Sequence, residues 1–293
     1  MSPRTGILET AAPTATALDA RVVEIGGVPI ALRTRSLRFA RMVEERYAGF
    51  VTRNEIRSGT IQFDIELLDS APSVVNENDE LQDDALQEDD LEVTFESGLW
   101  RMCRGDFSAE WDPVIGQGRI RQAMNPYSLD SVLRIVHSLV LARRGEFLVH
   151  AASVILRGRA VLFAGVSGAG KTTISRLAPA DATLLTDEIS YVRKSAKGYA
   201  AHGTPFTGEL ARLGAHCSAP LSALYLLRQG PENRIDEIDP ALATQALLRN
   251  ILFFARNAEL VQSIFEGACE FVHRVPVRQL TFRKDASVWE LLA

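Results

Sequence analysis

The chain has 293 residues, of which 46% are hydrophobic and 24% are charged, as in a typical globular protein. This composition excludes a wholly disordered, collagen-like or low-complexity chain, and the length predicts about two domains. The formal net charge is -5, but the segment from Glu77 to Glu92 holds nine acids and no base, so the remainder carries +4. A near-neutral chain with one acidic segment argues against nucleic acid as a partner.

Cysteine content and hydropathy indicate a cytoplasmic protein without a membrane partner. Cys103, Cys217 and Cys269 are far apart and form no CxxC pair, so we expect neither a disulfide framework nor a zinc site, but buried or half-buried thiols. The N-terminal residues lack the apolar core of a signal peptide, and no stretch reaches the roughly 20 apolar residues that span a bilayer. The oligomeric state is left open, with a homo-oligomer as one option.

The first part of the chain predicts a loose tail over residues 1–18 and a small α+β domain over 19–126. Within this domain we expect a hairpin around Gly26-Gly27, a helix over 37–51, a strand over 61–69 and two or three strands over 91–113. The acidic loop, residues 75–91, has no aromatic side chain and predicts a solvated segment, or alternatively a docking site for a basic partner.

The second domain, residues 127–293, opens with an amphipathic helix over 127–144. Ser128 is its expected N-cap, Asp130 favours its first turn, and Gly145 stops it. The remaining elements are expected in this order: a hairpin over 189–206 with its turn at 195–198, a strand over 221–229, helices over 241–248 and 251–266, a strand over 275–282 and a short helix over 286–292.

The strongest motif is the phosphate-loop pattern GxxxxGK[ST]. It consists of Gly165, Val166, Ser167, Gly168, Ala169, Gly170, Lys171 and Thr172, followed by Thr173. An apolar strand at 160–164 precedes it, and 172–178 predicts a helix. In such loops the glycines turn backbone N–H groups around an anion, the helix N-terminus adds positive charge, the lysine reaches the β- and γ-phosphates, and the hydroxyl ligates Mg²⁺. The motif predicts binding of a nucleoside triphosphate.

His150 is predicted to stand beside this loop. Only residues 157–159 separate the strand that contains it from the strand at 160–164, which is too short for a parallel crossover, so the two strands must form an antiparallel hairpin. A two-residue turn would place His150 opposite Gly165, and a three-residue turn would place it opposite Val166. Either register favours a functional role over a structural one.

Two acids, Asp187 and Glu188, follow the apolar strand ATLLT at 182–186. In phosphate-loop enzymes an acid at the end of a nearby strand holds Mg²⁺ or accepts the proton of the nucleophile. We therefore predict functional roles for both acids.

Two further groups of residues are weaker candidates, and each has a plain structural alternative. His202, Thr204, Pro205 and Glu209 either line the mouth of the site or form an ordinary loop. Arg249 and Arg256 are either phosphate partners or surface ion pairs.

These features together resemble the HPr kinase/phosphorylase family, whose nucleotide-binding core is shared with ATP-type phosphoenolpyruvate carboxykinase. The resemblance covers about residues 127–293 and is strongest in LVHAASVILRGRAVLFAGVSGAGKTT and LLTDEISYV. It looks closest to the divergent HPr-kinase-like proteins, some of which are thought to phosphorylate peptides in biosynthetic clusters. Two features differ from the HPr enzymes: Glu188 stands in place of an aspartate, and HGTPFTGEL occupies the place of a glycine-rich segment.

The resemblance implies an α/β fold with a phosphate-loop kinase core, a mixed sheet and an antiparallel hairpin before the loop. It implies that residues 165–172 bind ATP, that His150 is the active-site histidine and that Asp187 takes the proton from an acceptor serine. It also places Thr172 and Glu188 near Mg²⁺.

The expected activity is an ATP- and Mg²⁺-dependent kinase acting on a serine-type hydroxyl of a protein or peptide, with Lys171, Asp187 and His150 catalytic and with Thr172, Asp187 and Glu188 near the metal. One alternative is a kinase or carboxykinase-like enzyme acting on a small molecule. The other is a nucleotide-binding regulator with little turnover. Consumption of ATP in the presence of candidate peptides separates the regulator from the enzymes.

Overall fold

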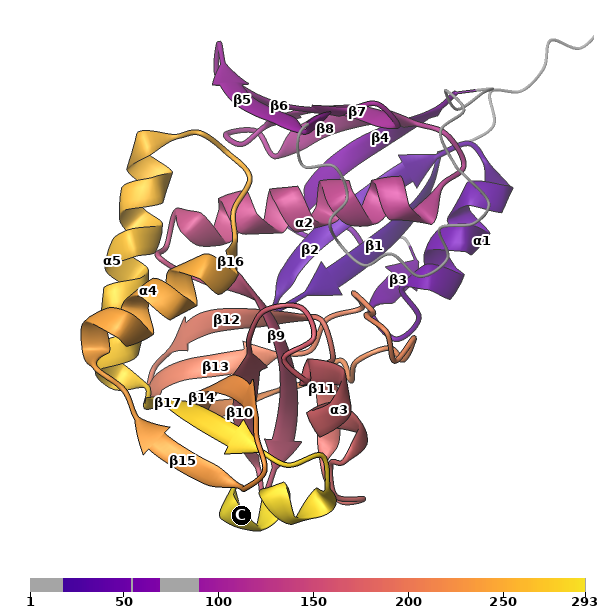
Figure 1. The fold of residues 1–293 in the computed structure, drawn as a ribbon. Helices are drawn as coiled ribbons and strands as arrows, with labels where there is room; N and C mark the ends of the chain where they lie inside the picture. Colours follow the sequence, from indigo (N-terminus) through magenta and orange to yellow (C-terminus); the bar gives the residue numbers. More distant parts are fainter. Residues whose placement is uncertain (1–17, 54, 69–89, 293) are drawn as a thin grey trace, which may run out of the picture.

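The computed structural model describes residues 18–53, 55–68 and 90–292 and shows an α/β fold with two large mixed sheets and few helices (Figure 1). All of the expected tail except Leu18, and all of the acidic loop except Asp90 and Leu91, lie outside the described residues. None of the described helices is long and apolar enough to cross a membrane.

The first sheet is built from the N-terminal part of the chain in the order β3-β1-β2-β4-β8-β7-β6-β5. Its strands are β1 (Asp19–Ile25), β2 (Val28–Thr34), β3 (Val51–Arg53), β4 (Ile61–Leu67), β5 (Glu92–Glu96), β6 (Leu99–Arg104), β7 (Phe107–Asp112) and β8 (Gln117–Gln122). The hairpin around Gly26-Gly27 is confirmed, since Ile25 pairs with Val28, and both glycines have positive φ values of 58° and 77°. The pairs β2–β4 and β4–β8 are parallel, and the rest are antiparallel.

Two helices cover this sheet, and both differ in their bounds from the sequence prediction. Helix α1 (Leu37–Arg46) is shorter than the predicted 37–51, because the chain turns at Gly49, which has a φ of 82°, and enters β3. Helix α2 (Pro126–Ala142) is capped by Asn125 and not by Ser128: the Asn125 side chain accepts from the Tyr127 N–H. A proline in the first turn needs no N–H partner, so it suits this start.

The second sheet contains the predicted phosphate-loop strand. Its strands are β9 (Phe147–Leu156), β10 (Arg159–Ala164), β11 (Thr183–Thr186), β12 (Ile189–Ser195), β13 (Gly198–His202), β14 (Ser218–Gln229), β15 (Arg234–Glu237), β16 (Ile251–Leu252) and β17 (Val277–Phe282). Strands β10, β9, β12, β13 and β14 pair in a closed ring, because the long strands β9 and β14 each contact neighbours along both halves. The β10–β14 and β14–β17 pairs are parallel, so this sheet is mixed.

The helices of the second part are α3 (Lys171–Arg176), α4 (Pro240–Asn250), α5 (Ala258–Arg274) and the 3-10 helix η2 (Ala286–Leu291). The predicted helix over 251–266 is wrong at its start: residues 251–252 pair with β9 as β16, and α5 begins only after its N-cap Asn257. Its apolar residues are used in an extended segment because they pack beside β9.

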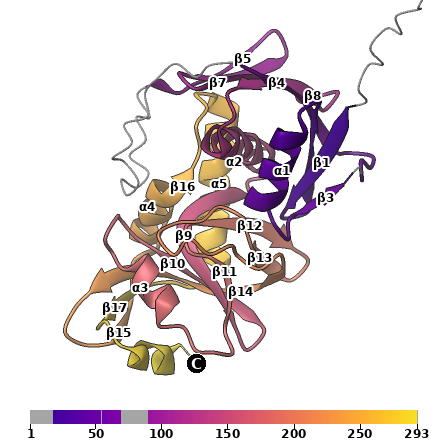
Figure 2. The same cartoon turned by 90° about the vertical axis from the view of Figure 1, so that its right-hand side faces the viewer.

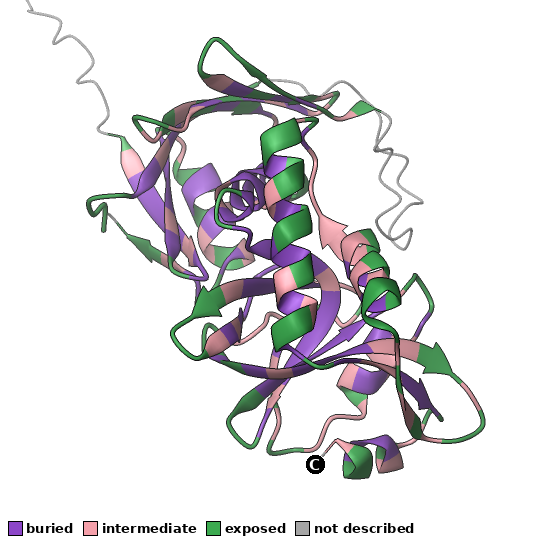
Figure 3. Cartoon of the chain, turned by 90° about the vertical axis from the view of Figure 1, so that its left-hand side faces the viewer, coloured by how far each residue is buried: buried purple, intermediate pink, exposed green. Residues whose placement is uncertain are grey.

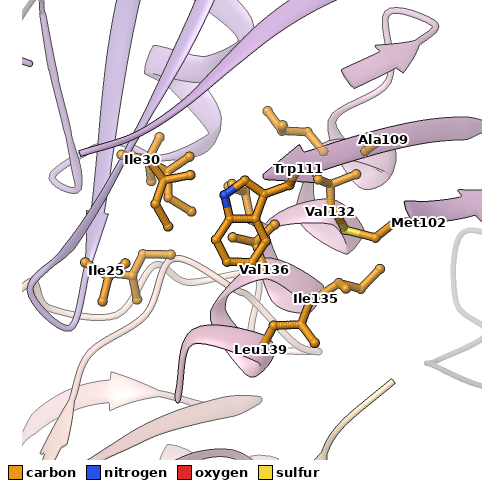
Figure 4. Close-up of a cluster of buried hydrophobic side chains, with 14 of the residues drawn as sticks. Ile25, Ile30, Met102, Ala109, Trp111, Val132, Ile135, Val136 and Leu139 are labelled. Atoms are coloured by element: carbon orange, nitrogen blue, oxygen red, sulfur yellow. The ribbon is translucent and has the colours of Figure 1, made fainter. Parts of the chain in front are cut away.

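The main hydrophobic core joins the two sheets through α2, which lies between them (Figures 1 and 2). Trp111 of the first sheet lies among Ile25 and Ile30 of the first hairpin and Val132 and Val136 of α2 (Figure 4). The same core includes Leu148, Ile189 and Tyr191 of the second sheet, and burial is concentrated where these layers meet (Figure 3). Because α2 packs against both parts, the boundary at residue 126 stays a prediction.

The three cysteines are all exposed, contrary to the buried or half-buried thiols expected. Cys103 lies on the exposed face of β6, opposite the face that buries Trp100 and Met102. Cys269 lies on the side of α5 that lines an open hollow with α4.

Candidate functional site

The candidate site lies where three separate segments meet beside the middle of β9, at His150 and Ala151. Strands β10 and β11 both pair antiparallel with β9, on its two sides, so they run in the same direction and their carboxyl ends lie at the same edge. Ala164 pairs with Ala151, while Ile189, just after the two acids, pairs with His150. Continuing the β9–β10 register by one step brings His150 opposite Gly165, at the start of the glycine loop.

The predicted hairpin before the glycine loop is confirmed. Arg159 pairs with Leu156, which leaves a two-residue turn at Arg157-Gly158, and both turn residues have positive φ values of 50° and 76°. Such values match the right-handed twist of the flanking strands. The two-residue turn selects the Gly165 register over the Val166 register.

The loop between β10 and α3 has glycines where its backbone requires them. Gly168 and Gly170 have φ values of 75° and 109°, and a Cβ added to Gly170 would lie 2.6 Å from the ring of Phe282. The Val166 carbonyl accepts from the Ala169 N–H at 3.0 Å, and the Gln229 side chain donates to the Gly168 carbonyl at 2.6 Å. The loop is therefore a tight turn that is fixed from two sides.

Lys171 begins α3 and turns its amine back over the loop. Its Nζ donates to the Gly165 carbonyl at 3.2 Å, and the residue is 8% exposed. Thr172 and Thr173 follow in the first turn and are half-buried. Helix α3 ends at Arg176, two residues earlier than predicted, so the positive potential at the loop depends on Lys171 and on loop amides more than on a long helix dipole.

Asp187 is a buried carboxylate that holds a neighbouring loop. It is 2% exposed, its Oδ1 accepts from the Gly208 N–H at 3.0 Å, and its Oδ2 accepts from the Leu210 N–H at 2.9 Å. Charge-assisted bonds of this kind are stronger than neutral ones. Asp187 thus ties the segment after β13 to the end of β11.

Glu188 and His150 form a contact across the strand edge. The Glu188 carboxylate is 5% exposed, and its Oε1 lies 3.1 Å from His150 Nδ1. His150 is half-buried, with 27% of its side chain exposed, so one ring edge contacts the acid while part of the ring remains accessible. The structure therefore brings the predicted His150, Asp187 and Glu188 together, with Lys171 and the loop at the adjoining strand end.

The turn between β11 and β12 is shaped by Thr186, which the sequence prediction did not single out. Its hydroxyl accepts from the N–H groups of Glu188 and Ile189 at 3.1 and 3.2 Å and donates to the Phe206 carbonyl at 3.3 Å. A threonine directly before paired acids is the local signal that could have indicated it, because short hydroxyl side chains often bond the backbone two or three residues on. Gly208 was also missed, since its hydrogen-bond partner Asp187 is 21 residues away in sequence.

Of the weaker candidates at and after the end of β13, some lie beside the acids and His202 does not. Thr204 and Pro205 are buried, and the Thr204 hydroxyl donates to the Ile189 carbonyl at 2.8 Å, so this segment packs under the acids. Glu209 is exposed beside Gly208. His202 instead pairs with Tyr191 along β12, and burial lowers its pKa to about 4.

Neither predicted arginine is placed at the glycine loop. Arg249 lines a hollow between α4 and α5 together with Leu248, Phe265 and Cys269, and Arg256 is exposed before α5. The structure gives no support for them as phosphate partners.

The side chains of the site are of the types that can hold a nucleotide together with its magnesium ion. Among the described residues, no group of three or more His, Cys, Asp and Glu side chains is arranged to hold a metal. Mg²⁺ in phosphate-transfer sites uses only one or two carboxylates and takes its other ligands from phosphates and water. Thr172, Asp187 and Glu188 supply oxygen donors of that kind, and a Cβ at Gly165 would lie 2.7 Å from the Ala169 Cβ, which shows how closely the loop folds.

The fold and the site define an α/β protein in which a glycine loop leads into a helix beside two buried carboxylates. The chain belongs to the family of the SynChlorMet cassette protein ScmC, whose family model matches residues 119–292, from β8 through η2. No curated protein matches the chain.

Proposed function

We propose that the protein is an ATP- and Mg²⁺-dependent kinase that phosphorylates a serine-type hydroxyl on a protein or peptide. The observation that carries the proposal is the convergence of the glycine loop, His150 and the Asp187–Glu188 pair at one edge of the second sheet. The proposal extends to a phosphate-loop kinase core of the HPr-kinase-like type, which the antiparallel hairpin before the loop supports.

The roles of the residues follow from their positions. The loop from Gly165 to Gly170 offers backbone N–H groups to the phosphates, and Lys171 neutralises charge on them. Mg·ATP supplies the phosphoryl group and the metal that compensates its charge. Phosphoryl transfer needs little covalent chemistry from the protein, so alignment and electrostatics dominate.

The two acids have different roles in this proposal. Asp187 orients the acceptor hydroxyl and takes its proton, while Glu188 and Thr172 supply oxygen atoms on the metal side. His150 holds the Glu188 carboxylate through Nδ1, since the two atoms lie 3.1 Å apart. Its partly exposed ring then faces the reacting groups.

The test measures binding and transfer separately. Calorimetry with ATP, with and without Mg²⁺, should show Mg²⁺-dependent binding. Mass spectrometry should detect phosphoserine when ATP is offered with serine-containing peptides that are encoded by genes next to that of this protein. Failure to bind any nucleoside triphosphate would refute the proposal. Binding with transfer only to small hydroxyl compounds would favour the small-molecule enzyme, and binding without any turnover would favour the regulator.

A further inference from the structure

Gly208 approaches the two acids more closely than any larger residue could. A Cβ built on Gly208 would lie 2.3 Å from Glu188 Oε2, 3.1 Å from Asp187 Oδ2 and 3.2 Å from the Glu188 Cβ. Contacts below 3.0 Å are essentially never seen for real Cβ atoms, so a side chain here requires the Glu188 carboxylate or the loop to move. The backbone N–H of the same residue donates to Asp187 Oδ1 at 3.0 Å.

Movement of Glu188 away from this contact is not free. Its side chain is 5% exposed and lies against His150, and its own backbone N–H is fixed by the Thr186 hydroxyl at 3.1 Å. The loop is equally restrained, because the Leu210 N–H is bonded to Asp187 Oδ2 at 2.9 Å and the Phe206 carbonyl to Thr186 at 3.3 Å.

We infer that Gly208 is a positioning residue: its bare α-carbon lets the loop after β13 close onto the acids, and this closure sets where the Asp187 and Glu188 carboxylates point. The residue need not touch ATP or acceptor. The effect on phosphate transfer rests on the proposed kinase function, whereas the effect on the loop does not.

The experiment compares Gly208→Ala with Gly105→Ala as a matched control. Gly105 lies in the turn between β6 and β7, where an added Cβ meets nothing within 4 Å. Hydrogen exchange of the segment 205–212 reports whether the amides of Gly208 and Leu210 still bond to Asp187. Release of inorganic phosphate from Mg·ATP, with water as acceptor, reports turnover, and calorimetry reports ATP affinity.

Gly208→Ala should lose exchange protection in 205–212 and lower turnover by about 10²-fold with ATP affinity near that of the parent, since misplacing a reacting group by about 1 Å costs a factor of that size. Gly105→Ala should match the parent. Adding Glu188→Asp to Gly208→Ala shortens the clashing side chain by one methylene and should restore protection and part of the turnover relative to Gly208→Ala.

Parent-like protection in Gly208→Ala would overturn the inference, and so would a double variant no better protected than the single one. If Gly208→Ala alone does not fold, the double variant decides: a folded, protected double variant supports the inference, and an unfolded one overturns it. A parent protein that neither binds nor consumes ATP refutes the proposed kinase, while the exchange results still decide the role of Gly208.

Discussion

Two clusters around buried carboxylates differ in the kind of group that contacts the acid. Asp130 on α2 is 4% exposed and lies between the Arg46 guanidinium and the Tyr47 hydroxyl, whose oxygen is 2.6 Å from Asp130 Oδ1. Burial and the neighbouring carboxylate raise the pKa of Tyr47 well above its usual value. These contacts join the end of α1 to α2 through side chains that are far apart in sequence.

The Asp187–Glu188 cluster instead places two carboxylates side by side in sequence, with backbone amides and a half-exposed histidine as partners. The Arg46 guanidinium pairs with the buried Asp130 carboxylate, whereas Asp187 and Glu188 follow the end of β11, at the same edge as the glycine loop. The comparison teaches that burial alone does not mark a functional acid. The roles proposed for Asp187 and Glu188 rest on their partners and on their place at the strand end.

The largest effect on ATP binding should come from Lys171→Ala, which removes the cation that lies over the glycine loop. ATP affinity should fall by about 10²-fold or more, because a buried charged hydrogen-bond donor contributes up to about 3 kcal/mol. The melting temperature should stay near that of the parent, since Nζ bonds to the backbone of the same loop. Calorimetry and thermal unfolding measure both quantities. Lys197→Ala, in the exposed turn between β12 and β13, is the control, and equal ATP affinity in the two variants would contradict the assignment.

Asp187→Asn should lower phosphate transfer by about 10²–10⁴-fold, the usual cost of losing a general base. Asparagine has one acceptor oxygen, so one of the amides of Gly208 and Leu210 also loses its partner. If Asp187 mainly holds Mg²⁺, affinity for Mg·ATP should fall too, and excess Mg²⁺ should restore part of the activity. A Mg²⁺ titration of turnover and affinity separates the two roles. Asp130→Asn, which alters the other cluster, should keep both values, and full activity of Asp187→Asn would remove Asp187 from the mechanism.

The parts of the site that sequence predicted well are those fixed by short segments. Three residues between two strands permit only a hairpin, so the sequence placed His150 at the start of the glycine loop, opposite Gly165 or Val166, and the structure selects Gly165. The acids were found because they follow an apolar strand. In contrast, Gly208 contacts the acids, and the Phe206 carbonyl contacts the Thr186 hydroxyl, only through the tertiary fold. A glycine within HGTPFTGEL gives no sign of which side chains it touches.

Errors in the fold have similarly local physical causes. Ser128 was a plausible cap, but Asn125-Pro126 starts α2 earlier and leaves the Ser128 hydroxyl to donate to Asp106 at 2.6 Å. The apolar run after Asn250 suits a helix and an edge strand equally, and pairing with β9 decides for the strand. The 3.6-residue period of a helix cannot be distinguished over so few residues.

Asp130→Asn should reduce the free energy of unfolding by about 3 kcal/mol, because it leaves the partly buried Arg46 without its carboxylate. Urea denaturation measures the loss. The control is Asp64→Asn, which breaks the more exposed Arg33–Asp64 pair, where the acid is 46% exposed, and should cost no more than about 1 kcal/mol. Similar losses in the two variants would mean that the Asp130 cluster is not the structural anchor described above.

The smallest expected effect concerns His137, which links α2 to the strand after the acids. Its Nδ1 lies 3.2 Å from the Tyr191 hydroxyl, and complete burial lowers its pKa from 6.5 to about 3. Below pH 6.5 the His137 imidazole is protonated in the unfolded chain but stays neutral in the folded chain. The contribution of His137 to stability therefore falls as the pH decreases towards 3. Between pH 7 and pH 5 the loss should be about 2 kcal/mol. His137→Gln should flatten the pH profile of urea unfolding by that amount, whereas His273→Gln, at an exposed position on α5, is the matched control. Because the acids titrate in both proteins, only the difference between the two profiles isolates His137. Parallel profiles for parent and His137→Gln would show that this histidine is not the acid-sensitive link between α2 and β12.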